Sequence, residues 1–240
     1  MGHAVTEVLP LPAGSVIGDL ARVVRHCWLM DDVYLDRLDT LEHIWQVWAQ
    51  LGADLTEEQW STGTRCPGWD VAAVYAHYSV FPLLMSAAPP LPDGPVGEPV
   101  TAVEIVRRFN APDGAAHTRA ETLAEEVVSD AAAHTRTELV DRFSVHGPRA
   151  LHWLRQTGAT TVVSWPVSGT PVTLVEALRI VLLEATVHLL DIQRALDHPP
   201  VVPKPALQDT VQLLAELAPA VELIEAATGR STHSPLPVLR

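Results

Sequence analysis

Two residues that can bind a metal ion stand four positions apart in an apolar stretch of the chain. Glu184 and His188 lie within a run of leucine, valine, alanine and isoleucine that is typical of a buried helix. On a helix, this spacing places both side chains on one face, about 6 Å apart at Cβ. A carboxylate in an apolar interior is costly unless it has a partner. A divalent ion is one such partner, because a carboxylate and an imidazole both coordinate zinc at roughly 2.0–2.2 Å.

A third ligand must come from another helix, and His77 is the best candidate. It lies in an apolar helical segment that starts just after a sharp turn. Asp191, three residues after His188, continues the face that carries the acid–imidazole pair. Spacing alone leaves simpler interpretations open. Glu184 and His188 could form an ordinary intrahelical pair, and His77 could be a core or surface histidine.

The composition indicates a globular protein and argues against nucleic acid as a partner. The chain has 240 residues, and 48% of them are hydrophobic, which is enough for a sizeable core. The net charge of -13 repels phosphate backbones. Two cysteines cannot build a disulfide framework, and neither a signal peptide nor a membrane-spanning run is apparent. We expect a cytoplasmic monomer or homodimer without membrane partners. The residue composition is of the kind found in actinobacteria.

Helical periodicity dominates the chain, and prolines and glycines separate the helical segments. We predict helices at about residues 29–51, 71–86, 101–110, 116–143, 149–157, 174–196 and 205–228, with a shorter one near 18–26. Pro219 is expected to break the last of these segments. Residues 158–172 are rich in β-branched side chains, which predicts an extended segment or a small hairpin. Long helices with short connections indicate an all-α bundle, in which facing helices project ligands into the interior.

Local signals predict where several of these elements begin and end. Gly52 is expected to end the first long helix, Asp70 to cap the next one, and Pro82 to kink that helix or end it early. Thr173 and Glu176 have the spacing of a capping box in front of the helix that carries the candidate ligands.

We divide the chain into an N-terminal arm at residues 1–28, a helical bundle at 29–200 and a C-terminal helical extension at 201–240. Within the bundle, residues 87–99 contain five prolines and two glycines, which predicts a surface loop.

Two short motifs stand in order, roughly a hundred residues apart. The first is the turn Cys66–Trp69 (Cys-Pro-Gly-Trp), followed by a helix that bears His77. The second is Glu-x3-His-x2-Asp, formed by Glu184, His188 and Asp191. Together they resemble the signature of the mycothiol-dependent maleylpyruvate isomerase N-terminal family, part of the DinB-like superfamily.

The resemblance covers about residues 29–200 and implies a DinB-like four-helix bundle. It implies that His77, Glu184 and His188 hold a divalent metal, with zinc expected, and that Asp191 orients a ligand or a substrate group. In the family, a low-molecular-weight thiol, typically mycothiol, takes the open position on the metal. A free thiol with a pKa of about 8.5 is only slightly ionised at neutral pH, whereas metal coordination deprotonates it. The thiolate then attacks an electrophilic carbon.

The resemblance also sets limits on the reaction. The isomerase carries a separate C-terminal domain with a catalytic arginine, whereas about 40 residues follow the predicted bundle here. We therefore expect a thiol S-transferase or thiol-exchange enzyme acting on an electrophilic small molecule, rather than an isomerase. Two alternatives stay open: a thiol-independent hydrolase that activates water at the same metal, and a non-catalytic bundle with a structural or vestigial metal site.

Several further residues have no assigned role. Cys66 precedes a helix N-terminus, where a thiolate is favoured, but packing as a small apolar side chain is the stronger expectation. Trp69 could line a pocket, although core packing is expected. Arg65, Arg155 and Arg230 could each bind a carboxylate of the thiol or substrate, and the sequence does not rank them.

Overall fold

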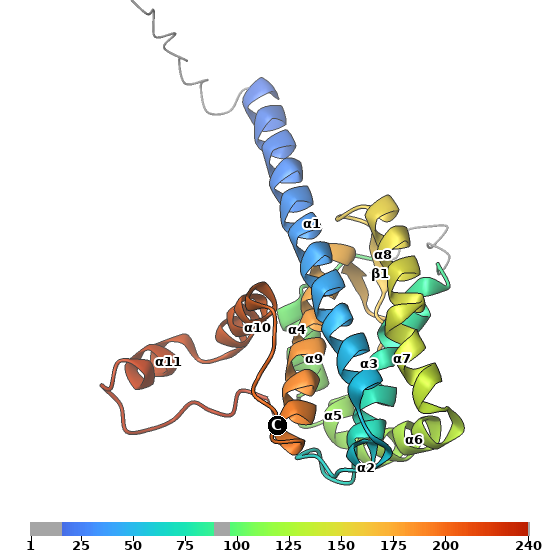
Figure 1. Cartoon of the computed structure of the whole chain (residues 1–240). Coiled ribbons are helices and arrows are strands. Elements are labelled where there is room, and N and C mark those ends of the chain that lie inside the picture. Colours follow the sequence, from blue (N-terminus) through green and yellow to red (C-terminus); the bar gives the residue numbers. More distant parts are fainter. Residues whose placement is uncertain (1–15, 89–96, 240) are drawn as a thin grey trace, which may run out of the picture.

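The computed structural model describes residues 16–88 and 97–239, and most of these residues are helical (Figure 1). The elements follow in the order α1 (Val16–Asp54), α2 (Glu57–Trp60), α3 (Val71–Ser86), α4 (Ala102–Phe109), α5 (Ala115–Thr118), α6 (Ala120–Ala133), α7 (Arg136–Ser144), α8 (His146–Thr157), β1 (Val162–Ser164), β2 (Pro171–Thr173), α9 (Leu174–Ala195), α10 (Lys204–Leu217) and α11 (Ala220–Ala227). None of the described helices combines the length and the apolar character needed to cross a lipid bilayer.

The predicted all-α, four-helix bundle is confirmed. Its members are α1, α3, α9 and the consecutive pair α7 and α8 (Figure 1). Both α9 and the α7–α8 pair pack against α1 and against α3. Outside this bundle, α10 packs on α9 and α4, whereas α11 buries none of its side chains and stands away from the bundle in Figure 1. β1 and β2 form the predicted small antiparallel hairpin.

The helix α3 packs against α6, α7, α8 and α9. It begins at Asp70, whose carboxylate accepts a hydrogen bond from the Ala73 amide at 2.8 Å, as predicted. Most of its side chains are buried on every face, which is typical of a central helix. Pro82 does not end it, and the helix continues to Ser86. Burial of most side chains in the first two and a half turns and of Pro82 itself outweighs the one backbone hydrogen bond that proline removes.

Hydrogen bonds across the core set the position of α9 along α1 and α3. The Tyr78 hydroxyl, in α3, accepts a bond from Trp45 Nε1 at 2.8 Å and donates one to the Val181 carbonyl of α9 at 3.3 Å. Trp48 Nε1, in α1, donates to the Ala185 carbonyl at 3.2 Å. These side chains are buried. The turn of α9 that they hold is the one that carries the first candidate ligand.

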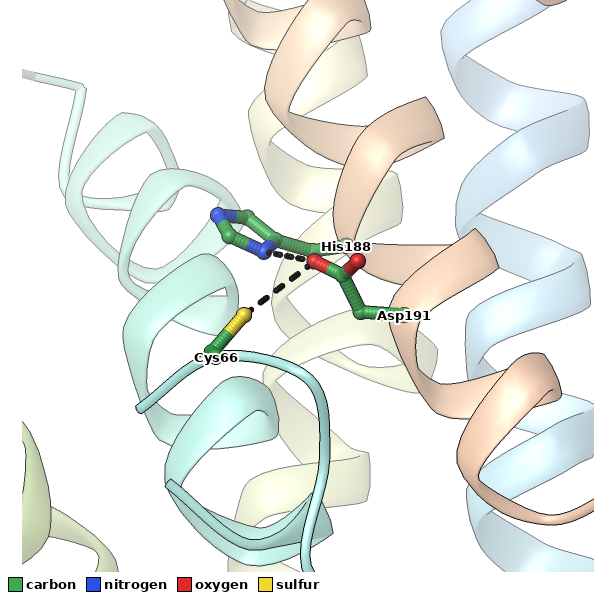
Figure 2. Close-up of side chains that lie close together, drawn as sticks. All are labelled: Cys66, His188 and Asp191. Carbon is green, nitrogen blue, oxygen red and sulfur yellow. Dashed lines mark hydrogen bonds and ion pairs between the residues drawn. The ribbon is translucent and has the colours of Figure 1, made fainter. Parts of the chain in front are cut away.

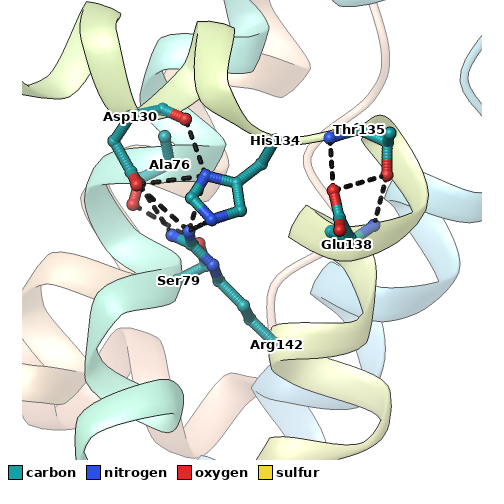
Figure 3. A network of polar contacts seen from close by, with 7 residues as sticks. All are labelled: Ala76, Ser79, Asp130, His134, Thr135, Glu138 and Arg142. Carbon is teal, nitrogen blue, oxygen red and sulfur yellow. Dashed lines mark hydrogen bonds and ion pairs between the residues drawn. The ribbon is translucent and has the colours of Figure 1, made fainter.

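A buried arginine joins α7 to α6 and α3 (Figure 3). Arg142 is 4% exposed and donates to both carboxylate oxygens of Asp130, at 2.8 and 3.2 Å, and to Ser79 Oγ at 3.2 Å. The ring of His134 lies against the same guanidinium. The hydrogen bonds from Arg142 lower the pKa of Asp130, so this carboxylate stays charged and partners the buried cation.

The structure corrects several predicted boundaries and caps. Gly52 does not end α1, which continues to Asp54. A Cβ at this position would lie 2.7 Å from Val140 Cγ2 and 2.8 Å from the Tyr75 hydroxyl, so the glycine permits close packing inside a helix.

The predicted helix at 116–143 is wrong, because the chain forms α5, α6 and α7 there. Thr135 opens α7 with a capping box to Glu138, a local signal that competes with helix continuation. The capping box of Thr173 and Glu176 is also wrong: Thr173 makes no side-chain cap, and the Glu176 carboxylate instead accepts a hydrogen bond from Ala102 N at the start of α4, at 2.7 Å.

At the N-terminus, the short helix predicted near 18–26 and the one predicted from residue 29 form a single helix, α1. The structure therefore describes the second half of the predicted arm as helix, and residues 1–15 lie outside the described residues. Most of the loop predicted at 87–99 also lies outside them.

Candidate metal centre

The structure brings the three predicted ligands together from two helices. His77 comes from α3, and Glu184 and His188 come from α9. Glu184 Oε2 lies 3.6 Å from His77 Nε2 and 3.2 Å from His188 Nε2. One potential ligand atom from each residue lies within 4.8 Å of the other two, and all three side chains are partly buried.

These separations suit a small divalent cation. Three ligand atoms at about 2.1 Å from one ion in tetrahedral geometry are about 3.4 Å apart. The measured 3.2 and 3.6 Å lie on either side of that value. Two histidines and one carboxylate are also a donor set that catalytic zinc sites use, with a fourth position left open. The residues present therefore fit a divalent ion.

The Glu184 carboxylate and the His188 imidazole shift each other's pKa. Burial on its own would raise the pKa of Glu184, but hydrogen bonds to His188 and His77 outweigh it and lower that pKa far below its usual range. Burial on its own would lower the pKa of His188, and hydrogen bonds to Asp191, Cys66 and Glu184 raise it well above the usual value. Glu184 is therefore anionic at neutral pH, and a proton competes with a cation for His188.

Asp191 lies on the far side of the His188 ring from Glu184. Its side chain is 5% exposed, and its Oδ2 atom is 2.9 Å from His188 Nδ1. Figure 2 shows the carboxylate facing the imidazole ring. A carboxylate at this distance favours a proton on Nδ1. Once Nε2 gives up its own proton, its lone pair is directed to the space shared with Glu184, where a cation would bind.

The turn in front of α3 supplies two contacts that the sequence did not assign. Arg65 Nε donates to Asp191 Oδ1 at 2.5 Å. Cys66 Sγ donates to Asp191 Oδ2 at 3.3 Å, and Figure 2 shows this second contact. Cys66 packs against the core, as expected, but its thiol also reaches the site. The signal in the sequence was their place at the start of the first motif, with Cys66 in it and Arg65 directly before it; only the fold reveals the contact with the second motif.

The structure also ranks the three arginines. Only Arg65 among them contacts a described residue of the candidate centre. Arg155 donates to Asp39 and Glu42 at 3.0 and 2.7 Å, and Arg230 contacts a backbone carbonyl two residues before it.

Short-range hydrogen bonds keep this turn compact. The Thr64 amide and hydroxyl both donate to the Trp69 carbonyl at 2.9 Å, and the Trp69 amide donates to the Cys66 carbonyl at 3.0 Å. Gly68 has a φ of 81°, a left-handed conformation that costs other residues about 1–2 kcal/mol. The same turn places Asp70 at the N-cap of α3.

Trp69 forms a wall of the centre. Its ring centroid lies 4.9 Å from that of His77 and 6.3 Å from that of His188. Core packing was the expectation for this tryptophan, and it is only partly buried, against both imidazoles.

The sequence model of the mycothiol maleylpyruvate isomerase N-terminal domain matches residues 41–193, well over half of the chain. The chain belongs to this family. The match runs from within α1 to near the end of α9 and therefore includes every residue of the centre described above. A search of curated proteins and a search of solved structures each returned no match. Membership in the mycothiol maleylpyruvate isomerase N-terminal family links the chain to mycothiol-related, metal-binding DinB-like proteins.

Within this family domain, a second group also has ligand spacing. One atom each of Cys66, His188 and Asp191 lies within 4.8 Å of the others. The Arg65 guanidinium already provides a cation at Asp191, and the Nδ1 atom of His188 is taken up by the same carboxylate. We therefore interpret this second group as a hydrogen-bonded support for His188.

Proposed function

We propose that this protein is a metal-dependent enzyme that activates a low-molecular-weight thiol, mycothiol or a close analogue, for attack on an electrophilic small molecule. The observation that carries the proposal is the convergence of His77, Glu184 and His188, in a member of a mycothiol-related family. A divalent ion bound there, with zinc expected, would lower the pKa of a bound thiol so that the thiolate forms at neutral pH.

Each residue of the centre has a defined part in this proposal. Glu184 supplies the one negative charge of the ligand set, and its lowered pKa keeps it ionised. His77 and His188 complete the set from two helices, and Asp191 holds the tautomer of His188. Trp69 lies beside both imidazoles, with its ring tilted against theirs, and in this proposal it limits the directions from which substrate approaches.

The charge of the ligand set favours an anion as the further ligand, and a thiolate or a hydroxide would each meet this need. Two neutral imidazoles and one carboxylate carry a single negative charge, one fewer than a divalent ion. A thiolate balances the difference, whereas a fourth acidic protein ligand would remove the need for it. Among the described residues, the nearest such acid, Asp191, is held by Arg65 on the other side of His188.

Transfer or exchange of the thiol is proposed over isomerisation. We propose a thiol and an electrophilic small molecule as the partners of the protein, which acts as a monomer or homodimer. The net charge of -13 disfavours nucleic acid as a partner.

Metal analysis of the purified protein tests the proposal. We expect one equivalent of divalent metal in the wild type, none in His188→Ala, and one in the control His152→Ala, whose histidine lies exposed on α8. In the cobalt-substituted wild type, titration with mycothiol should add a sulfur-to-cobalt charge-transfer band in the near ultraviolet.

The other outcomes separate the alternatives. Metal binding without any spectral response to thiol would refute the thiol-activating role and indicate a structural site. Turnover of an electrophile in the absence of thiol would favour a hydrolase, and a wild type without metal would refute the proposal altogether.

A further inference from the structure

Three hydrogen-bond donors converge on the buried carboxylate of Asp191. Oδ2 accepts from His188 Nδ1 at 2.9 Å and from Cys66 Sγ at 3.3 Å, and Oδ1 accepts from Arg65 Nε at 2.5 Å. The histidine belongs to α9, like the aspartate, whereas the other two donors come from the turn before α3. The carboxylate is thus held from two elements that are far apart in the sequence.

Resting on the function proposed above, we propose that Arg65 and Cys66 are positioning residues. They hold the Asp191 carboxylate against His188 Nδ1, and through it they keep the His188 ring in the orientation that directs Nε2 toward Glu184. In this arrangement the turn before α3 acts on the metal centre without supplying a ligand.

The rigidity of the turn supports this role. Thr64 Oγ1 accepts a bond from the Cys66 amide at 3.1 Å and donates to the Trp69 carbonyl, so Arg65 lies between two tied residues. An aspartate on a helix has several side-chain rotamers, and only some of them place the Asp191 carboxylate within hydrogen-bond distance of the His188 ring. A second and a third donor on a fixed turn restrict the carboxylate to that rotamer.

The charge of Arg65 provides a way to distinguish positioning from simple electrostatics. A guanidinium near a cation site repels the cation, so charge removal alone would make the protein bind zinc more tightly. Loss of positioning has the opposite sign, because residues that orient a metal-bound histidine typically contribute 10–100-fold to metal affinity. The side chain of Arg65 is 58% exposed, which weakens the electrostatic effect further.

Zinc affinity, measured by competition with a chromophoric chelator, tests the proposal. We expect Arg65→Gln to weaken zinc binding about tenfold and Arg65→Lys to weaken it less. Cys66→Ala should weaken it a few-fold, and Cys66→Ser, which keeps a donor, should restore it. Arg119→Gln is the matched control, because it removes an exposed arginine that pairs with Glu126 at 3.9 Å.

A second measurement reads the orientation directly. Long-range proton–nitrogen NMR of the imidazoles should show a slowly exchanging Nδ1 proton on His188 in the wild type. This signal should be lost or broadened in Arg65→Gln, while the midpoint of thermal unfolding reports whether the variant is folded.

Unchanged or tighter zinc binding by folded Arg65→Gln, with the Nδ1 proton retained, would overturn the proposal. If the wild type binds one zinc and all variants match it, only the positioning role fails. If the wild type binds no zinc, the proposed function fails, and the NMR signal still decides whether Arg65 and Cys66 orient His188.

Discussion

The hydroxyl of Tyr78 joins three helices of the bundle, and its removal is the sharpest test of how the core positions the centre. The side chain is fully buried. Its hydroxyl accepts from Trp45 Nε1 of α1 and donates to the Val181 carbonyl of α9, three residues before Glu184. Tyr78→Phe keeps the ring and removes both bonds.

The expected loss of stability comes from the Trp45 indole, which would lose its hydrogen-bond acceptor. Trp45 is 2% exposed, so its indole N–H would lose its acceptor without gaining water. An unsatisfied buried donor costs about 1–3 kcal/mol. The Val181 carbonyl contributes less, because its bond to the hydroxyl is long, at 3.3 Å. We predict that the free energy of unfolding falls by about 1–3 kcal/mol, which for a domain of this size lowers the midpoint by roughly 3–10 °C.

Urea denaturation followed by far-ultraviolet circular dichroism measures this loss, and a double-mutant cycle with Trp45→Phe identifies its source. Because the double variant lacks both donor and acceptor, it should be about 1 kcal/mol more stable than the sum of the single losses predicts. Zinc affinity should fall modestly in Tyr78→Phe, because the contact that sets α3 against α9 is weakened. A destabilisation under about 0.5 kcal/mol, or strict additivity in the cycle, would refute the reasoning.

Three further predictions concern the turn, the buried ion pair and the centre. Gly68→Ala should destabilise the protein by about 1–2 kcal/mol in chemical denaturation, because the left-handed φ of 81° disfavours a side chain. Gly63→Ala is the control, because nothing lies within 4 Å of a Cβ added there. Equal losses of stability in the two variants would contradict the argument. Asp130 has a lowered pKa, so its contribution to stability is present above its unfolded pKa of about 3.8 and is lost as the pH falls through the lower folded value. Asp130→Asn should therefore lose roughly 1–3 kcal/mol of stability at pH 7, and its stability should fall less steeply at acid pH. An unchanged acid dependence of stability would argue against the pair. Zinc affinity should fall by about tenfold per pH unit below the raised pKa of His188, because zinc binding must displace the proton of this imidazole. Asp191→Asn removes a group that raises this pKa, so the loss of affinity should begin at a lower pH. A pH-independent affinity would show that His188 is not a ligand.

Much of the fold could be predicted from local patterns. The periodicity of apolar residues predicted the helical bundle and the β-branched segment predicted the hairpin, since both depend on neighbours along the chain. The Asp70 cap is equally local. Errors arose where a distant contact competes with a local signal: Gly52 accommodates Tyr75 and Val140, and Glu176 caps α4 rather than its own helix.

The sequence by itself determined which residues can serve as ligands and that Glu184 and His188 share a face, because an i, i+4 spacing fixes that geometry on any helix. The two motifs also identified the family, which the comparison confirmed. Only the tertiary structure decided that His77 lies 3.6 Å from Glu184 and that Arg65 and Cys66 contact Asp191. These residues are separated by more than a hundred positions, so their distances depend on how α3 and α9 align. That alignment is set by buried hydrogen bonds and packing across the core, which no local spacing encodes.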